Sequence, residues 1–209
     1  MAGFGRSEAS KASAAYRKNA ANNKAYSDRE FSIKAVTEEI IEAVPKIYGI
    51  RFSEAQAINL QNAHKALLVA AQNKEIGTEA GVYLNKDMNQ TTSFVFGKIG
   101  KIRMPDSTSD AKAMIHNHPS GETFSLNDIS LFTTDENLDI LTAIGNDGSL
   151  YMLEKTEEYN FSEIQHLYIQ AALENPTSIE ELPKIIKERE VLFDDFRRYG
   201  LNYTTIRNT

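Results

Sequence analysis

Two histidines stand two positions apart in the middle of this chain, at His116 and His118. The mostly apolar residues before them predict a strand over 112–117, and Pro119 predicts its end because proline cannot donate to a sheet. Residues i and i+2 of a strand face the same side, so both imidazoles can be directed at one point. Imidazole is a common metal ligand, and the pair predicts one side of a metal site.

A Ser-x-x-Asp pair follows within the next ten residues, at Ser125 and Asp128. The apolar residues after it predict a helix over about 126–136, with Asp128 in its first turn and directed back toward the histidines. Two imidazoles and one carboxylate make three protein ligands, and a zinc ion bound by three ligands keeps a fourth position for water. The same pair also resembles a helix capping box, and capping and metal binding can coexist.

The run His-Asn-His-Pro-Ser-Gly, together with the later Ser-x-x-Asp, resembles the signature of the JAMM (JAB, MPN-plus) metalloproteases. It is especially similar to prokaryotic and phage members, including the RadC-like proteins. The resemblance covers about residues 53–156 and implies that His116, His118 and Asp128 bind Zn²⁺. It also implies that Ser125 stabilises the tetrahedral intermediate and that an upstream glutamate is the general acid and base.

The spacing departs from the family pattern at one point. The gap between His118 and Ser125 is one residue shorter than usual, which affects the loop that contains Ser120 and Thr123. These two residues are the alternative hydroxyl donors if Ser125 does not occupy the family position.

The resemblance places the upstream glutamate just after a helix, near the start of the first core strand. Helical spacing of apolar residues predicts that helix over 53–74, with Ser53 as its N-cap. A strand-like run follows at 80–85, and Glu79 stands directly before it. Glu75, at the end of the helix, and Glu122, in the loop after the histidines, are the alternatives.

The remaining pattern predicts an α+β fold with a mixed sheet flanked by helices, as in the JAMM (cytidine-deaminase-like) core. Residues 1–30 are predicted to form a basic tail or frayed helix, 31–156 the metallohydrolase domain, and 157–209 a C-terminal helical extension that packs on the core. Further elements are predicted from periodicity and turn residues: helices at 31–48, 161–171 and 178–197, and strands at 91–98, 99–104, 138–144 and 149–153.

Composition sets limits on partners and compartment. The first 24 residues carry a net charge of +4, whereas the whole chain carries −6, so the remainder carries −10 and is poorly suited to nucleic acid. No apolar run is long enough to cross a bilayer, and no secretory signal is visible at the N-terminus. The absence of cysteine fits the cytosol, without excluding export by another route. The resemblance to prokaryotic and phage members implies a bacterial or phage-encoded protein. The other two histidines, His64 and His166, are interpreted as surface residues without a role in the site.

Three functions follow from these patterns. The first is a zinc metallopeptidase or isopeptidase that acts on a protein or peptide, such as a ubiquitin-like or phage protein. The second is a metal-dependent nuclease or phosphohydrolase of RadC-like type. The third is a non-catalytic interaction domain associated with a phage particle or a toxin. The complete set of ligand types favours the first, while oligomeric state and substrate stay open.

Overall fold

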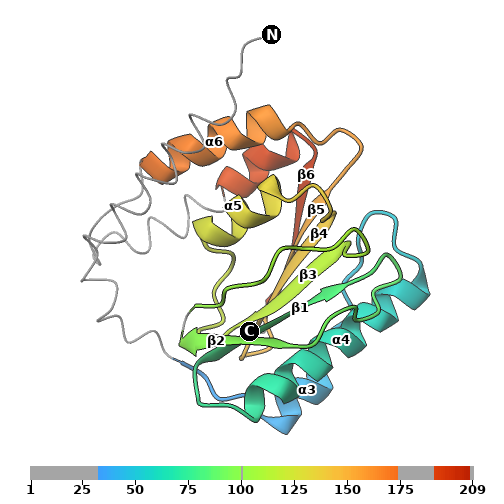
Figure 1. Ribbon diagram of the computed structural model, residues 1–209, viewed down its shortest axis with the longest axis vertical. Helices are drawn as coiled ribbons and strands as arrows, with labels where there is room; N and C mark the ends of the chain where they lie inside the picture. The colour runs from blue at the N-terminus through green and yellow to red at the C-terminus, as the bar shows by residue number, and fades with distance from the viewer. Residues whose placement is uncertain (1–32, 100, 174–190, 208–209) are drawn as a thin grey trace.

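The computed structural model describes residues 33–99, 101–173 and 191–207 (Figure 1). Its centre is a mixed sheet of six strands in the order β2-β1-β3-β4-β5-β6, in which β3 and β4 are parallel and the other neighbours are antiparallel. The predicted α+β class is confirmed. The strands are β1 (Thr78–Leu84), β2 (Val95–Ile99), β3 (Ala113–His118), β4 (Ile140–Gly145), β5 (Leu150–Lys155) and β6 (Leu201–Ile206).

Helices cover both faces of the sheet (Figure 1). α3 (Glu38–Ala43) and α4 (Glu54–Gln72) pack on one face, and α5 (Leu126–Thr134) and α6 (Phe161–Leu173) pack on the other. Each face buries its own apolar cluster, because successive strand residues point to opposite sides. Val82, Ile115 and Ile144 belong to the cluster under α4, whereas Tyr83, Met114 and Leu141 belong to the cluster under α5 and α6.

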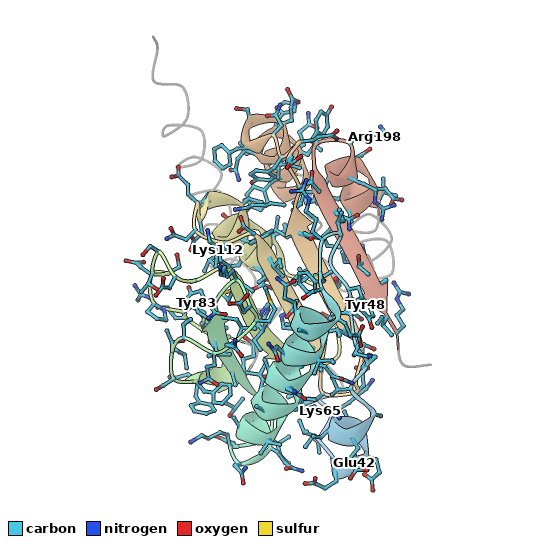
Figure 2. All side chains as sticks on the ribbon, turned by 90° about the vertical axis from the view of Figure 1, so that its right-hand side faces the viewer. Glu42, Tyr48, Lys65, Tyr83, Lys112 and Arg198 are labelled. Carbon is cyan, nitrogen blue, oxygen red and sulfur yellow. The ribbon has the colours of Figure 1, made fainter. Side chains whose placement is uncertain are left out.

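α4 matches the helix predicted over 53–74. Ser53 is its N-cap: its hydroxyl accepts from the Gln56 N–H at 3.2 Å, and the Gln56 side chain accepts from the Ser53 N–H at 2.8 Å. This reciprocal capping box satisfies two donors at the helix start. Figure 2 shows Lys65 on the outer side of α4 beside Glu42 of α3, whose backbone carbonyl accepts from the Lys65 ammonium at 3.1 Å.

Because β3 and β4 are parallel, the loops that follow these two strands begin at the same edge of the sheet. Parallel neighbours need a crossover connection, and α5 supplies it. The register pairs His118 with Gly145, so the carboxyl ends of both strands reach the same edge of the sheet. Ligand sites of open sheets with parallel strands lie outside these carboxyl ends.

The helix predicted over 31–48 is much shorter than expected. In the described part of that range only α3 is helical, and it begins after Thr37, whose hydroxyl accepts from the Ile40 N–H at 3.4 Å. The preceding chain is held by distant partners instead: the Lys34 N–H donates to the Pro119 carbonyl at 3.0 Å. Apolar spacing alone therefore overestimated this helix.

The strand predicted over 99–104 is wrong. β2 ends at Ile99, and the described residues 101–104 form no strand. This segment instead crosses the face of β1. Gly81 permits the close approach, since a Cβ there would lie 2.8 Å from the Met104 sulfur. The Tyr83 hydroxyl then holds the segment by donating to the Pro105 carbonyl at 2.7 Å.

The C-terminal region extends the sheet. β6 pairs antiparallel with β5 over its whole length, so a segment predicted only to dock on the core contributes an edge strand. The predicted hairpin of 138–144 and 149–153 is confirmed as β4 and β5. The basic N-terminal segment over 1–30 and most of the helix predicted at 178–197 lie outside the described residues. Among the described helices, none is both long and apolar enough to cross a membrane.

Candidate metal centre

The two histidines occupy the end of β3, as the period-two pattern predicts. All six residues of β3 are buried, and His116 is 0% and His118 8% exposed. Their Nε2 atoms lie 2.9 Å apart, so both imidazoles are directed at one point. Pro119 follows the last residue of the strand.

Asp128 reaches the histidines from the first turn of α5. Its Oδ1 lies 3.7 Å from the His116 Nε2, and its Oδ2 lies 3.5 Å from the His118 Nε2. Ser125 is the N-cap of the helix: its backbone N–H and its hydroxyl donate to Asp128 Oδ2 at 2.7 and 2.6 Å, while the hydroxyl accepts from the Asp128 N–H at 3.2 Å. The capping box therefore fixes the carboxylate that faces the histidines.

The three side chains fit a metal ion. Donor atoms about 2.0–2.2 Å from a tetrahedral zinc ion are separated from one another by roughly 3.3 Å. The two nitrogens lie 2.9 Å apart, Asp128 Oδ1 lies 3.7 Å from the His116 nitrogen, and Asp128 Oδ2 lies 3.5 Å from the His118 nitrogen, so these separations bracket that value. All three ligand atoms lie within 4.8 Å of one another in a buried setting. His116, His118 and Asp128 could thus hold one metal ion.

The short loop after β3 also orients one ligand. The His118 Nδ1 lies 2.7 Å from the Glu122 carbonyl oxygen, which can only accept, so Nδ1 carries a proton and donates. This leaves Nε2 as the metal-binding nitrogen, an arrangement typical of metal-bound histidines. The loop is held in turn by Tyr151, whose hydroxyl donates to the Gly121 carbonyl at 2.9 Å, and by the completely buried Phe124.

The charges of the three ligands depend on one another. Burial disfavours the charge of Asp128, but both histidines outweigh it and hold the pKa of Asp128 well below its usual range. Burial also lowers the pKa of His116, which stays neutral. For His118, burial is outweighed by hydrogen bonding to Asp128 and by the charges of Asp128 and Glu79, which raise its pKa to about 9. In the protein without metal, His118 is therefore protonated at pH 7.

Glu79 lies on β1 beside this group. It is 8% exposed, and burial raises its pKa to about 7, with the negative charge of Asp128 acting in the same direction. The positive charge of His118 and a hydrogen bond from the Ile102 backbone oppose this rise. A carboxyl group with a pKa near neutral can both accept and release a proton at physiological pH.

The alternative residues differ from Glu79 and Ser125 in burial or in hydrogen-bond partners. Glu75 is exposed after the end of α4, and the backbone carbonyl of Glu122 is used by His118. Thr123 lies with its hydroxyl 3.2 Å from the Tyr203 hydroxyl of β6, and Ser120 is half-buried in the loop. Of the hydroxyls considered, Ser125 is the one bonded to a ligand carboxylate.

The prediction that His64 is a surface residue is wrong. It is 0% exposed, and its Nε2 lies 2.7 Å from the Thr142 hydroxyl of β4. Burial lowers its pKa to about 3, so it is neutral. The signal was present, since His64 has helical spacing with the buried residues Leu60 and Leu67. His166 is exposed, as predicted.

Comparisons with protein-family models, with curated proteins and with solved structures found no match to this chain. Its function must therefore be inferred from the residues and geometry of the site.

Proposed function

We propose that this chain is a zinc-dependent hydrolase with a JAMM-like core, which cleaves a peptide or isopeptide bond with a metal-activated water. One observation carries this proposal: a buried group of His116, His118 and Asp128 lies beside Glu79, a buried carboxyl group whose pKa is near neutral. The sequence motif that resembles the JAMM signature supports it.

Each residue has a separate role in this proposal. His116, His118 and Asp128 would hold the zinc ion, which when bound lowers the pKa of a coordinated water to roughly 7 and polarises the scissile carbonyl. Glu79 accepts the proton of the attacking water and delivers it to the leaving amine, as its raised pKa allows. The Glu122 carbonyl keeps His118 in the required tautomer.

Ser125 would act twice. Its hydroxyl fixes Asp128 through the capping box, and by rotating away from that carboxylate it can donate to the oxyanion that develops on the substrate carbonyl. This second role follows from the family resemblance, and the capping role follows from the observed hydrogen bonds.

Two neighbouring classes of metal enzyme are less well supported. Two histidines and a carboxylate also suit the iron of non-haem oxygenases, but a proton-transferring carboxyl group beside the ligands favours hydrolysis. A two-metal nuclease needs a second cluster of ligands about 4 Å from the first. The group formed by the three ligands is the one such cluster that the described residues contain.

Metal analysis of the purified protein tests the proposed metal and its ligands. We expect one zinc per chain, with little iron, in the wild type and in His166→Ala, a control at an exposed histidine. We expect His118→Ala to lose the zinc. Equal zinc in His118→Ala and wild type would reject the assigned ligands, and iron in place of zinc would reject the assigned metal.

The reaction is tested with three kinds of substrate: isopeptide-linked conjugates, linear peptides and DNA. We expect cleavage of an isopeptide or peptide bond that depends on zinc and is absent in His118→Ala. Cleavage of DNA alone would favour the RadC-like nuclease of the sequence analysis.

A further inference from the structure

Asn117 stands between the two histidines and faces away from them. It is 0% exposed, and its side-chain amide makes three hydrogen bonds. Its Oδ1 accepts from the Ala80 N–H at 2.6 Å, and its Nδ2 donates to the Thr78 carbonyl at 3.3 Å and to the Asn146 side-chain oxygen at 2.9 Å. One buried amide therefore binds the backbone on both sides of Glu79.

The strand ladders leave Glu79 without regular pairing. The backbone pairs between β1 and β3 run from Leu84 to Gly81 and end there. Toward β2 the register shifts between Thr78 and Ala80, so an extra residue of β2 opposes Glu79. The bulge therefore lies in β2, where Gly97 and Lys98 both stand opposite Glu79. Where the regular pairing of β1 with β3 stops, the side-chain amide of Asn117 bonds the β1 backbone instead.

The same amide is connected to the backbone of a metal ligand. Asn146, in the turn after β4, accepts from Asn117 through its side chain, and its backbone N–H donates to the His118 carbonyl at 3.1 Å. The Asn146 side chain also donates to the Lys34 carbonyl at 2.8 Å. A continuous set of buried hydrogen bonds thus joins the backbone around Glu79 to that of His118.

We propose that Asn117 is a positioning residue, whose side-chain amide fixes the Glu79 carboxylate relative to the metal ligands on the opposite face of β3. This role rests on the proposed function, in which Glu79 accepts a proton from a water bound to the metal. Removal of the amide leaves the Ala80 N–H and the Thr78 carbonyl without this partner and loosens the β1 segment that carries Glu79. Misplacement by about 1 Å can cost roughly 10²-fold in rate.

Cobalt substitution tests this without a substrate. The visible spectrum of cobalt bound by the three ligands changes when the coordinated water loses its proton, and the midpoint of that change depends on the nearby Glu79 charge. Glu79→Gln defines the midpoint without this charge. We expect Asn117→Ala to bind cobalt fully but to shift the midpoint from the wild-type value toward that of Glu79→Gln.

The matched control is Thr142→Val. It also removes a buried side-chain hydrogen bond on the α4 side of the sheet, but in β4, and it leaves unchanged the Thr142 backbone that bonds to the His116 ring. We expect its midpoint to equal that of the wild type, although its stability falls. If Asn117→Ala does not fold, Asn117→Thr replaces it, since threonine suits a strand and its single hydroxyl cannot span both flanks of Glu79.

The outcomes separate the two proposals. An Asn117 variant that binds cobalt and titrates like the wild type would overturn the positioning role and leave the hydrolase proposal intact. A wild-type protein that binds no cobalt, or a Glu79→Gln variant with the wild-type midpoint, would reject the hydrolase site and the positioning role together. With an identified substrate, Asn117→Ala should lower kcat by roughly 10²-fold with little change in KM.

Discussion

Zinc affinity should depend steeply on pH, because the metal must displace a proton from His118. The pKa of this residue is raised to about 9 in the protein without metal. At pH 7 its Nε2 therefore carries a proton, which it can donate to the His116 Nε2 at 2.9 Å or toward the Asp128 Oδ2 at 3.5 Å. Zinc binds only the deprotonated nitrogen.

The magnitude follows from this pKa. At pH 7, two units below a pKa of about 9, the proton on His118 weakens zinc binding about 100-fold, because its removal costs about 2.7 kcal/mol. The His118 proton alone should make the apparent affinity rise about tenfold per pH unit up to pH 9, above which its contribution ends. The lowered pKa values of His116 and Asp128 favour their deprotonated forms, so these two ligands oppose zinc binding less than His118 does.

Below about pH 7, Glu79 should make the apparent zinc affinity depend more steeply on pH. Its pKa is raised to about 7, so below that pH it also carries a proton, which a nearby metal charge expels. At pH 6, where a zinc-bound water with a pKa of roughly 7 keeps its proton, the wild type should release close to two protons per zinc, one from His118 and one from Glu79. Glu79→Gln should release close to one at this pH.

Calorimetry in buffers of different ionisation enthalpy measures these proton numbers, and competition with a chromogenic chelator measures the affinity. His166→Ala, changed at an exposed histidine, should behave as the wild type. A zinc affinity that stays constant from pH 6 to 8, after correction for the chelator, would refute the assignment of His118 as a protonated ligand. Equal proton release in wild type and Glu79→Gln at pH 6 would show that Glu79 is not coupled to the metal.

Two further predictions concern catalysis and the helix cap. Glu79→Gln should retain zinc but lose about 10²–10⁴-fold in cleavage rate, the usual contribution of general acid–base catalysis. The controls Glu75→Gln and Glu122→Gln should lose little activity. A fully active Glu79→Gln would contradict this prediction. Ser125→Ala should lower the free energy of unfolding by about 1 kcal/mol through loss of the N-cap, and cleavage by about 10²–10³-fold if its hydroxyl also serves the oxyanion. Denaturant unfolding and steady-state rates separate these effects, and unchanged cleavage would restrict Ser125 to capping.

The local features of the site could be predicted from the sequence. The direction of His116 and His118 follows from the alternation of side chains along a strand, and Pro119 marks its end. The position of Asp128 follows from the cap at Ser125, which depends on residues only three apart. The hairpin of β4 and β5 likewise depends on its own turn. Each of these is set by contacts between residues close in the chain.

Features that depend on distant partners were not predictable. Lys34 stays extended because Pro119 and Asn146 bind its backbone, which shortens the helix expected there. The segment over 201–206 becomes a strand because the edge of β5 is open to it. The hydrogen bond between His64 and Thr142 likewise exists only because α4 lies over this part of β4.

The tertiary structure also decided the chemistry of the site. The sequence supplied a carboxyl group at Glu79, but its raised pKa results from burial beside Asp128, a residue far along the chain. The bonds from Asn117 to both flanks of Glu79 exist only because β1 and β3 are neighbours. Residue type and short-range spacing thus determined which groups are present. The packing of strands and helices determined their distances, and with these their protonation and their capacity to act together.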